Sequence, residues 1–131
     1  MLANLLKRLL NLKFSLWSVP PILLAVSALN TGLVITGLGF YLDDWSVIAA
    51  YSFGGMAGVK EMFFQDNRPF SIWTYAATFP ILGLRPLYWH LLLILLRWLT
   101  ALAFWFCLRA LWPGRTRQIT WVALLFTVYP A

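Results

Sequence analysis

The feature that most constrains this chain is the apolar run over residues 87–112. At about 1.5 Å per residue, a helix of this length reaches about 39 Å, more than the about 30 Å thickness of a bilayer's hydrocarbon core. Trp89 and Trp112 lie near its two ends, where tryptophan favours the membrane interface. The run therefore predicts a transmembrane helix that ends before Pro113 and Gly114.

The rest of the chain has the same character. Hydrophobic residues make up 62% of its 131 residues and charged residues only 11%, whereas a soluble domain usually carries about 25% charged residues. A chain this short cannot bury so much apolar side chain on its own. The composition thus excludes an ordinary soluble enzyme and predicts an all-α integral membrane protein. The lone cysteine, Cys107, offers neither a disulfide framework nor a metal cluster.

Two further segments are predicted before the acidic part of the chain. Residues 1–17 alternate leucine with basic residues, which is typical of a helix on an anionic membrane face. Residues 19–42 form the first predicted span, with Pro20 and Pro21 in its first turn. A signal peptide cleaved after residues 26–28 is the alternative, but the apolar run continues well past that point.

Residues 43–68 change character, because all four acidic residues lie there with three glycines. Gly54, Gly55 and Gly58 favour a flexible connection, so this segment is predicted as a loop outside the hydrocarbon that can include one short helix. Residues 69–84 are apolar but short and contain a proline, which favours an interfacial or re-entrant helix over a full span.

A third apolar segment occupies residues 118–131 and stops part-way through a span. The expected architecture is therefore two full transmembrane helices, one interfacial or re-entrant helix and a truncated third span. We expect residues 1–131 to form a single membrane domain that is a fragment of a larger multi-pass protein.

Charge asymmetry predicts the orientation. Residues 1–17 and 109–117 each hold three basic residues and no acidic one, whereas residues 43–68 hold four acidic and two basic residues. The positive-inside rule places the first two segments in the cytoplasm and the acidic loop on the extracytoplasmic side. We expect the protein to reside in the plasma membrane. Because the basic residues flank apolar segments rather than form one patch, we expect no nucleic-acid partner.

The acidic pair Asp43-Asp44 directly follows the first predicted span. A carboxylate at the membrane edge, partly out of water, gains a proton more readily and can act as a general base. Adjacent residues point in different directions, so the two aspartates do not share one task. The structural alternative is a solvated helix cap, since aspartate is a good N-cap.

Two other groups carry charge near or within apolar segments. Arg68 can pair with Asp66 or Asp43, or clamp a phosphate with its planar fork. The structural alternative is an arginine that snorkels from the membrane edge. His90 and Arg97 are seven residues apart and share one helix face. An arginine near the centre of a span costs about 2.5–3.5 kcal/mol, which indicates an anionic ligand, a polar cavity or an acidic partner. For Arg97 the structural alternatives are snorkelling to the interface or pairing with another helix. For His90 the structural alternative is an ordinary position at the membrane interface.

The order of these features resembles the N-terminal part of multi-pass glycosyltransferases of the GT-C class, close to the protein O-mannosyltransferases and the lipid A aminoarabinose transferases. The resemblance rests on the acidic pair, on Arg68-Pro69, and on Gly83, Pro86, Trp89 and His90. Relatives with tetratricopeptide repeats carry an asparagine and a second histidine further along this helix. Here Leu93 and Arg97 stand in their places, which is a departure from that pattern.

The resemblance implies a function. Such enzymes move a sugar from a polyprenyl-phosphate donor to an acceptor hydroxyl on the extracytoplasmic side. Asp43 and Asp44 would be the catalytic candidates. The candidates for binding the substrate and its phosphate are Asp66, Arg68, His90 and Arg97. The resemblance fixes no cofactor and leaves a divalent metal open. The partners it implies are the bilayer, the lipid-linked sugar and the later helices of a full-length enzyme, so the 131 residues alone are expected to lack transferase activity.

Two alternatives from other classes remain. A small non-enzymatic membrane subunit for assembly or interaction is favoured by the small residues Ala28, Gly32 and Thr36, spaced every four positions. A transporter fragment is favoured by Arg97 within a span.

Overall fold

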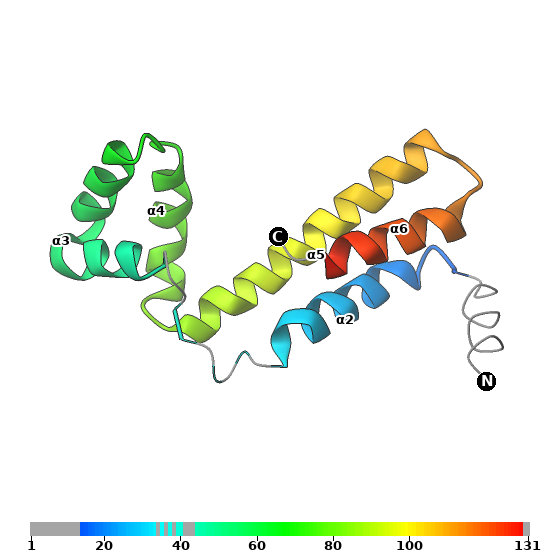
Figure 1. Ribbon diagram of the computed structural model, residues 1–131, viewed down its shortest axis with the longest axis horizontal. Helices are drawn as coiled ribbons and strands as arrows, with labels where there is room; N and C mark the ends of the chain where they lie inside the picture. The colour runs from blue at the N-terminus through cyan, green and yellow to red at the C-terminus, as the bar shows by residue number, and fades with distance from the viewer. Residues whose placement is uncertain (1–13, 34, 36, 38, 41–43, 130–131) are drawn as a thin grey trace. The chain divides into compact units, whose positions relative to one another are not determined.

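The computed structural model describes residues 14–33, 35, 37, 39–40 and 44–129. The predicted amphipathic stretch at residues 1–17 therefore lies mostly outside the described residues, as do Asp43 and Thr36. The described part contains five α-helices and is all-helical, as the composition predicts (Figure 1). They are α2 (Val19–Gly32), α3 (Asp44–Gln65), α4 (Ser71–Leu82), α5 (Pro86–Leu111) and α6 (Thr116–Val128).

Helix α5 matches the run that dominates the sequence. Among the described residues it is the one helix that is both long and apolar enough to cross a membrane. Only 17% of its most apolar stretch is buried by the rest of the chain. The core helix of a soluble protein would be mostly covered, whereas most of this apolar stretch is exposed.

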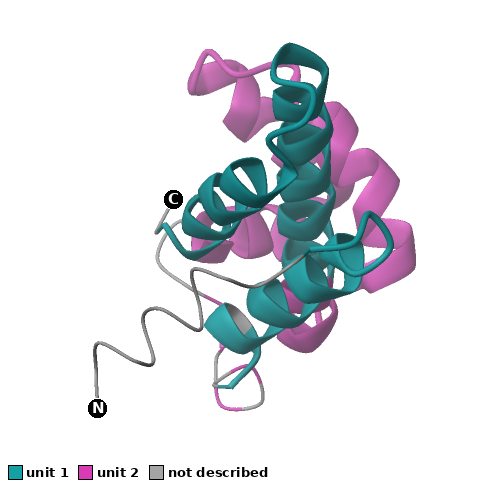
Figure 2. Ribbon diagram, turned by 90° about the vertical axis from the view of Figure 1, so that its right-hand side faces the viewer, with its two compact units in different colours: residues 1–33, 92–131 teal, residues 34–91 magenta. Residues whose placement is uncertain are grey.

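The chain divides into two compact units, which Figure 2 colours separately. Unit 1 comprises residues 1–33 and 92–131, and unit 2 comprises residues 34–91. In unit 1, α2 packs against α6, beside the larger part of α5. The buried core of this unit is formed by Val19, Leu23, Ala101, Trp105, Ile119 and Ala123.

Two tryptophan hydrogen bonds tie the helices of unit 1 together. The buried Trp105 Nε1 donates to Thr120 Oγ1 across 3.2 Å, and Trp98 Nε1 donates to the Pro20 carbonyl across 2.9 Å. Trp105 is 1% exposed, so its indole N–H would otherwise be left without a partner in an apolar core. Gly32 faces α5, since a Cβ placed there would lie 3.9 Å from Ile94 Cδ1.

Unit 2 is built on a break in α3. Gly55 has φ +57° and ψ −150°, a conformation that essentially only glycine adopts, and it separates the two halves of the helix. Gly58 then lets the second half approach the first, because a Cβ there would lie 2.4 Å from the Ala50 carbonyl oxygen. The core that results contains Val47, Val59, Phe63 and Phe79.

Aromatic rings fill the space between α3 and α4. The Tyr51 and Phe79 rings stack with centroids 4.0 Å apart and planes 1° apart, and the Phe63 and Tyr75 rings stack at 5.1 Å. Trp89, from the first turn of α5, contacts Phe79 edge-on at 5.1 Å. Aromatic pairs of this kind add about 0.5–1.5 kcal/mol each beyond burial of area.

Two predicted segments differ from the structure. The helix predicted over 19–42 ends at Gly32, because glycines at 32, 37 and 39 and a β-branched run at 34–36 lower helix propensity while keeping hydropathy high. The prediction of a loop over 43–68 is also wrong. The glycines there do not make a flexible connection but permit α3 to break and pack on itself. Helices α4, α5 and α6 lie within two residues of the starts predicted at 69, 87 and 118.

Candidate functional site

A polar pocket of about 400 Å³ in unit 2 brings together three of the predicted site residues. Asp44 begins α3, whereas Asp66 and Arg68 follow its end. The break at Gly55 returns the chain, so that both ends of α3 border one space. Tyr75 of α4 lines the same pocket, with Ser46, Val47, Met62 and Phe63. A volume of this size is in the usual range for a small-molecule site, about 300–1,000 Å³.

The backbone holds Asp66 and Arg68 in place through a helix-terminating motif. The Arg68 N–H donates to the Phe63 carbonyl across 2.9 Å, and the Asn67 N–H donates to the Phe64 carbonyl across 3.2 Å. Asn67 has φ +56°, so it takes the left-handed position of a Schellman motif. The Arg68 carbonyl then accepts from the Ser71 N–H, which leads directly into α4. Backbone hydrogen bonds alone therefore hold the main chain of residues 66–71 in this conformation.

Asp44 lies in the first turn of α3, and its side chain is exposed. Negative charge at a helix N-terminus is favourable because the first backbone N–H groups point toward it. This agrees with the structural interpretation of the acidic pair, while its place in the pocket wall agrees with the functional one. Asp43, the other catalytic candidate, lies outside the described residues.

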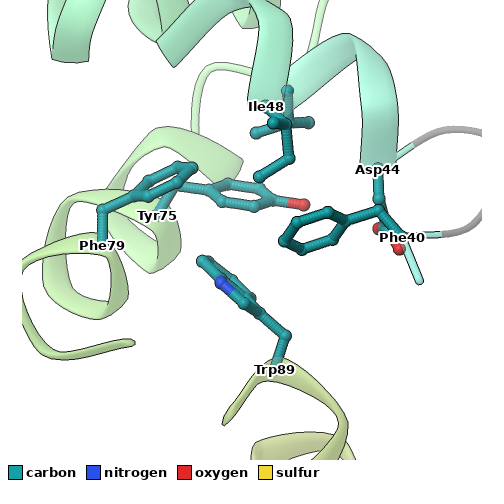
Figure 3. Close-up of a pocket in the computed structure, with 7 residues that line it drawn as sticks. Phe40, Asp44, Ile48, Tyr75, Phe79 and Trp89 are labelled. Carbon is teal, nitrogen blue, oxygen red and sulfur yellow. The ribbon is translucent and has the colours of Figure 1, made fainter. Parts of the chain in front are cut away.

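A second, smaller pocket adjoins the first and shares three of its residues. In Figure 3 the rings of Phe40, Tyr75 and Trp89 converge on it, with Ile48 above and Asp44 beside Phe40. Its volume is about 30 Å³, room for a group somewhat larger than one water molecule, which needs about 10–15 Å³. The two pockets therefore differ in both size and polarity.

Tyr75 is common to both pockets. Its pKa is raised above 10.0, first because burial disfavours the phenolate and second because the Asp44 carboxylate repels it. Tyr75 is therefore a neutral phenol at physiological pH. It can donate or accept a hydrogen bond between the aromatic pocket and the polar one.

Trp89 and His90 have partners that the sequence does not indicate. Trp89, which is predicted to lie at the membrane interface, donates its indole N–H to the Gly83 carbonyl across 2.9 Å, and its ring packs against Phe79. His90 Nε2 lies 3.1 Å from the Gly39 carbonyl. Since His90 does not line the polar pocket, its predicted role in phosphate binding has no support from this geometry.

Arg97 belongs to unit 1 and contacts the end of α6. Its Nε donates to the Thr127 carbonyl across 2.9 Å, and its Nη2 donates to the Tyr129 carbonyl. Helix α6 ends here because Tyr129 takes an extended conformation ahead of Pro130. The carbonyls of the last turn lack helical partners, and a guanidinium is a strong donor to them. Arg97 thus has a structural partner within this chain, which weakens the case for a transported anion.

Sequence reasoning identified Asp44, Asp66 and Arg68 separately, and the structure brings them together. It missed Tyr75 and Phe40, because an aromatic residue in an apolar segment carries no signal of its own. The sequence does indicate the partner of Arg97. The residue before a proline rarely continues a helix, so Tyr129-Pro130 predicts a helix end whose last carbonyls need hydrogen-bond donors.

No protein-family model, no curated protein and no solved structure matches this chain. The resemblance to GT-C glycosyltransferases therefore remains a prediction from the motif order.

Proposed function

We propose that this chain is part of a multi-pass membrane protein in which α5 is a spanning helix. Its 26 residues reach about 39 Å, and most of its apolar stretch is left uncovered by the rest of the chain. The first crossing would begin with α2, which reaches about 21 Å of the about 30 Å thickness of the hydrocarbon core. The basic segments 1–17 and 109–117 would face the cytoplasm.

Unit 2 would then lie on the extracytoplasmic side, at the membrane surface. Helix α4 has 12 residues and reaches only about 18 Å, too short to span but suited to the interface. Two of its side chains, Trp73 at 76% and Ile81 at 79%, are large, apolar and exposed. Tryptophan is enriched at the headgroup level, which supports an interfacial position for α4.

We further propose that the protein is a glycosyltransferase that uses a polyprenyl-phosphate sugar. The observation that carries this proposal is the polar pocket in which Asp44, Asp66 and Arg68 meet. Asp44 would take the proton of the acceptor hydroxyl as its oxygen attacks the anomeric carbon of the sugar. The bond from that carbon to the phosphate oxygen breaks, and the lipid phosphate leaves with the electron pair. Arg68 would stabilise the charge on the departing phosphate.

The test begins with the reading frame beyond residue 131, because the later helices would hold the lipid tail. In the protein expressed from that frame, Asp44→Asn should reduce sugar transfer by about 10²–10⁴-fold, the usual contribution of a general base. Asp43→Asn is tested in parallel, since either aspartate of the pair can be the base. Glu61→Gln is the matched control, as an exposed acid on α3 that does not line the polar pocket. Full activity in both aspartate variants would contradict the catalytic assignment.

A non-enzymatic membrane subunit is the second candidate. Gly32, which suggested a partner surface, faces Ile94 of this same chain, so the interface would instead lie on α5. Leu91, Leu93 and Phe106 are each more than half exposed on that helix. If a partner binds there, arginine in place of Leu93 should abolish co-purification in mild detergent, and the same change at the exposed Phe53 of α3 should not.

A further inference from the structure

The small aromatic pocket of unit 2 has walls that suit a cation. Phe40, Tyr75 and Trp89 point into one space, and the rings of Tyr75 and Trp89 lie 5.7 Å apart with an interplanar angle of 34° (Figure 3). The face of an aromatic ring carries partial negative charge and attracts ammonium or guanidinium groups within about 6 Å. Phe79 lines the same pocket and contacts the Trp89 ring edge-on at 5.1 Å.

The charge at the edge of this pocket has the matching sign. Among the residues that the structure describes, Asp44 is the one carboxylate in its lining, and Lys60, Arg68 and Arg85 of unit 2 do not line it. Asp44 and Tyr75 both line the pocket, and after burial the Asp44 carboxylate is the second cause of the raised pKa of Tyr75. The phenolic oxygen of Tyr75 and the carboxylate of Asp44 supply two acceptors for N–H donors. The lining therefore offers ring faces, two acceptors and negative charge.

The size of the pocket selects among cations. About 30 Å³ accommodates an ammonium nitrogen with its attached carbon but not a sugar ring. Guanidinium is planar and larger, so it would be limited to the pocket mouth. A small alkylammonium group fits the volume, the ring faces and the charge together.

We propose that this aromatic pocket binds the ammonium end of a small amine or of an amine-bearing headgroup. The proposal goes beyond the glycosyltransferase proposal, because it concerns the aromatic side of Asp44 and requires no sugar donor. A free amine and the headgroup of an ethanolamine phospholipid have the same ammonium chemistry. The experiment distinguishes these two sources.

The probe is methylammonium, titrated by ligand-observed NMR into the 131-residue chain in an uncharged maltoside detergent. Methanol serves as the neutral molecule of similar size. We expect saturable binding of methylammonium and none of methanol. Asp44→Asn and Trp89→Leu should each weaken the binding about tenfold, in line with the strength of a partly desolvated cation–π contact and its charge partner. Trp73→Leu, at an exposed tryptophan of α4, should leave it unchanged.

Competition then assigns the source of the ammonium group. If phosphoethanolamine and a short-chain phosphatidylethanolamine displace methylammonium equally, the site recognises the headgroup alone. If only the phospholipid displaces it, the site also requires the lipid part of the molecule. Equal binding of methanol and methylammonium would overturn the proposal, and so would wild-type binding in Asp44→Asn. Because Asp44 is exposed, that variant keeps the test valid even if Trp89→Leu fails to fold. No sugar transfer enters the readout, so failure here and failure of the glycosyltransferase proposal are separate results.

Discussion

Units 1 and 2 differ in their charge and in the residues that form their cores. Unit 1 has seven basic residues and no acidic one, whereas unit 2 has all four acidic residues and three basic ones. The core of unit 1 is mainly aliphatic around Trp105, while that of unit 2 is a stack of aromatic rings. Both units are rich in apolar residues, but only in unit 2 do acidic and basic side chains line the polar pocket. The distribution of the charged residues, rather than the apolar composition, distinguishes the two units.

Two arginines make the comparison concrete. In unit 1, Arg97 donates to backbone carbonyls at the end of α6, so its donors are used within the chain. In unit 2, Arg68 is exposed in the wall of a pocket, and its own main chain is held by the end of α3. Arg97 therefore has partners within the chain, whereas Arg68 is the binding residue of the proposed site, although the sequence presents both as cations in apolar surroundings.

The largest expected effect is on the break that forms unit 2. Gly58→Ala would place a Cβ 2.4 Å from the Ala50 carbonyl oxygen, a backbone atom that no side-chain rotation can move. We expect the free energy of unfolding to fall by about 3 kcal/mol, at the upper end of the usual cost of overpacking. The measurement is equilibrium unfolding in mixed detergent micelles, followed by near-ultraviolet circular dichroism of the stacked aromatic rings.

Gly54→Ala is the matched control in the same helix. Nothing lies within 4 Å of a Cβ at Gly54, and its backbone is not in the left-handed region. Replacing a helical glycine with alanine in open space should leave stability unchanged or raise it by up to about 1 kcal/mol. If the two variants were equally stable, the close approach of the two halves of α3 would be wrong.

The same break shows where sequence reasoning stops. The glycines at 54, 55 and 58 predict irregular backbone, which is correct at Gly55, but they do not reveal that helix continues on both sides. Because hydropathy reports the environment and not the conformation, it extended the first predicted span ten residues beyond the end of α2. Prolines and long apolar runs were more reliable guides at α5, since Pro86 begins this helix and Pro113 follows its end.

The candidate site was predictable in its parts but not in its assembly. Asp44, Asp66 and Arg68 are visible because charged residues are rare in this chain. Their shared pocket depends on where α3 turns back, which is a tertiary property of Gly55 and Gly58. The aromatic pocket was invisible for a different reason, because Phe40, Tyr75 and Trp89 come from three separate segments with no spacing rule between them.

An intermediate effect is expected at Arg97. Arg97→Leu would leave the Thr127 and Tyr129 carbonyls without their charged donor, and we expect a loss of about 2 kcal/mol of stability. Arg97→Lys should recover only part of it, because an ammonium cannot reproduce the planar fork. Arg115→Gln, at an exposed arginine of unit 1, should stay within about 0.5 kcal/mol of wild type.

The contrast with Arg68 sharpens this test. Arg68→Gln should leave stability nearly unchanged and weaken binding of a polyprenyl-phosphate lipid, measured by native mass spectrometry. Arg97→Lys should lower stability and leave the binding of that lipid nearly unchanged. If Arg97→Leu were as stable as wild type but lost lipid binding, the assignment of Arg97 to structure would be wrong.

The smallest effect is expected at Tyr75, and it appears only in alkali. Burial and then the Asp44 carboxylate raise the pKa of Tyr75 in the folded state above 10.0. Below pH 10 the phenol is protonated whether the chain is folded or not, so Tyr75→Phe should match the pH dependence of wild type. Above pH 10 the unfolded chain loses this proton first, and wild-type stability should fall by up to about 1.4 kcal/mol per pH unit from this group. Tyr75→Phe should remove that part of the decline, and Asp44→Asn should reduce it by removing the second cause. Unfolding curves between pH 8 and 11 measure the difference, and identical alkaline slopes for wild type and Tyr75→Phe would mean that unit 2 does not enclose this side chain.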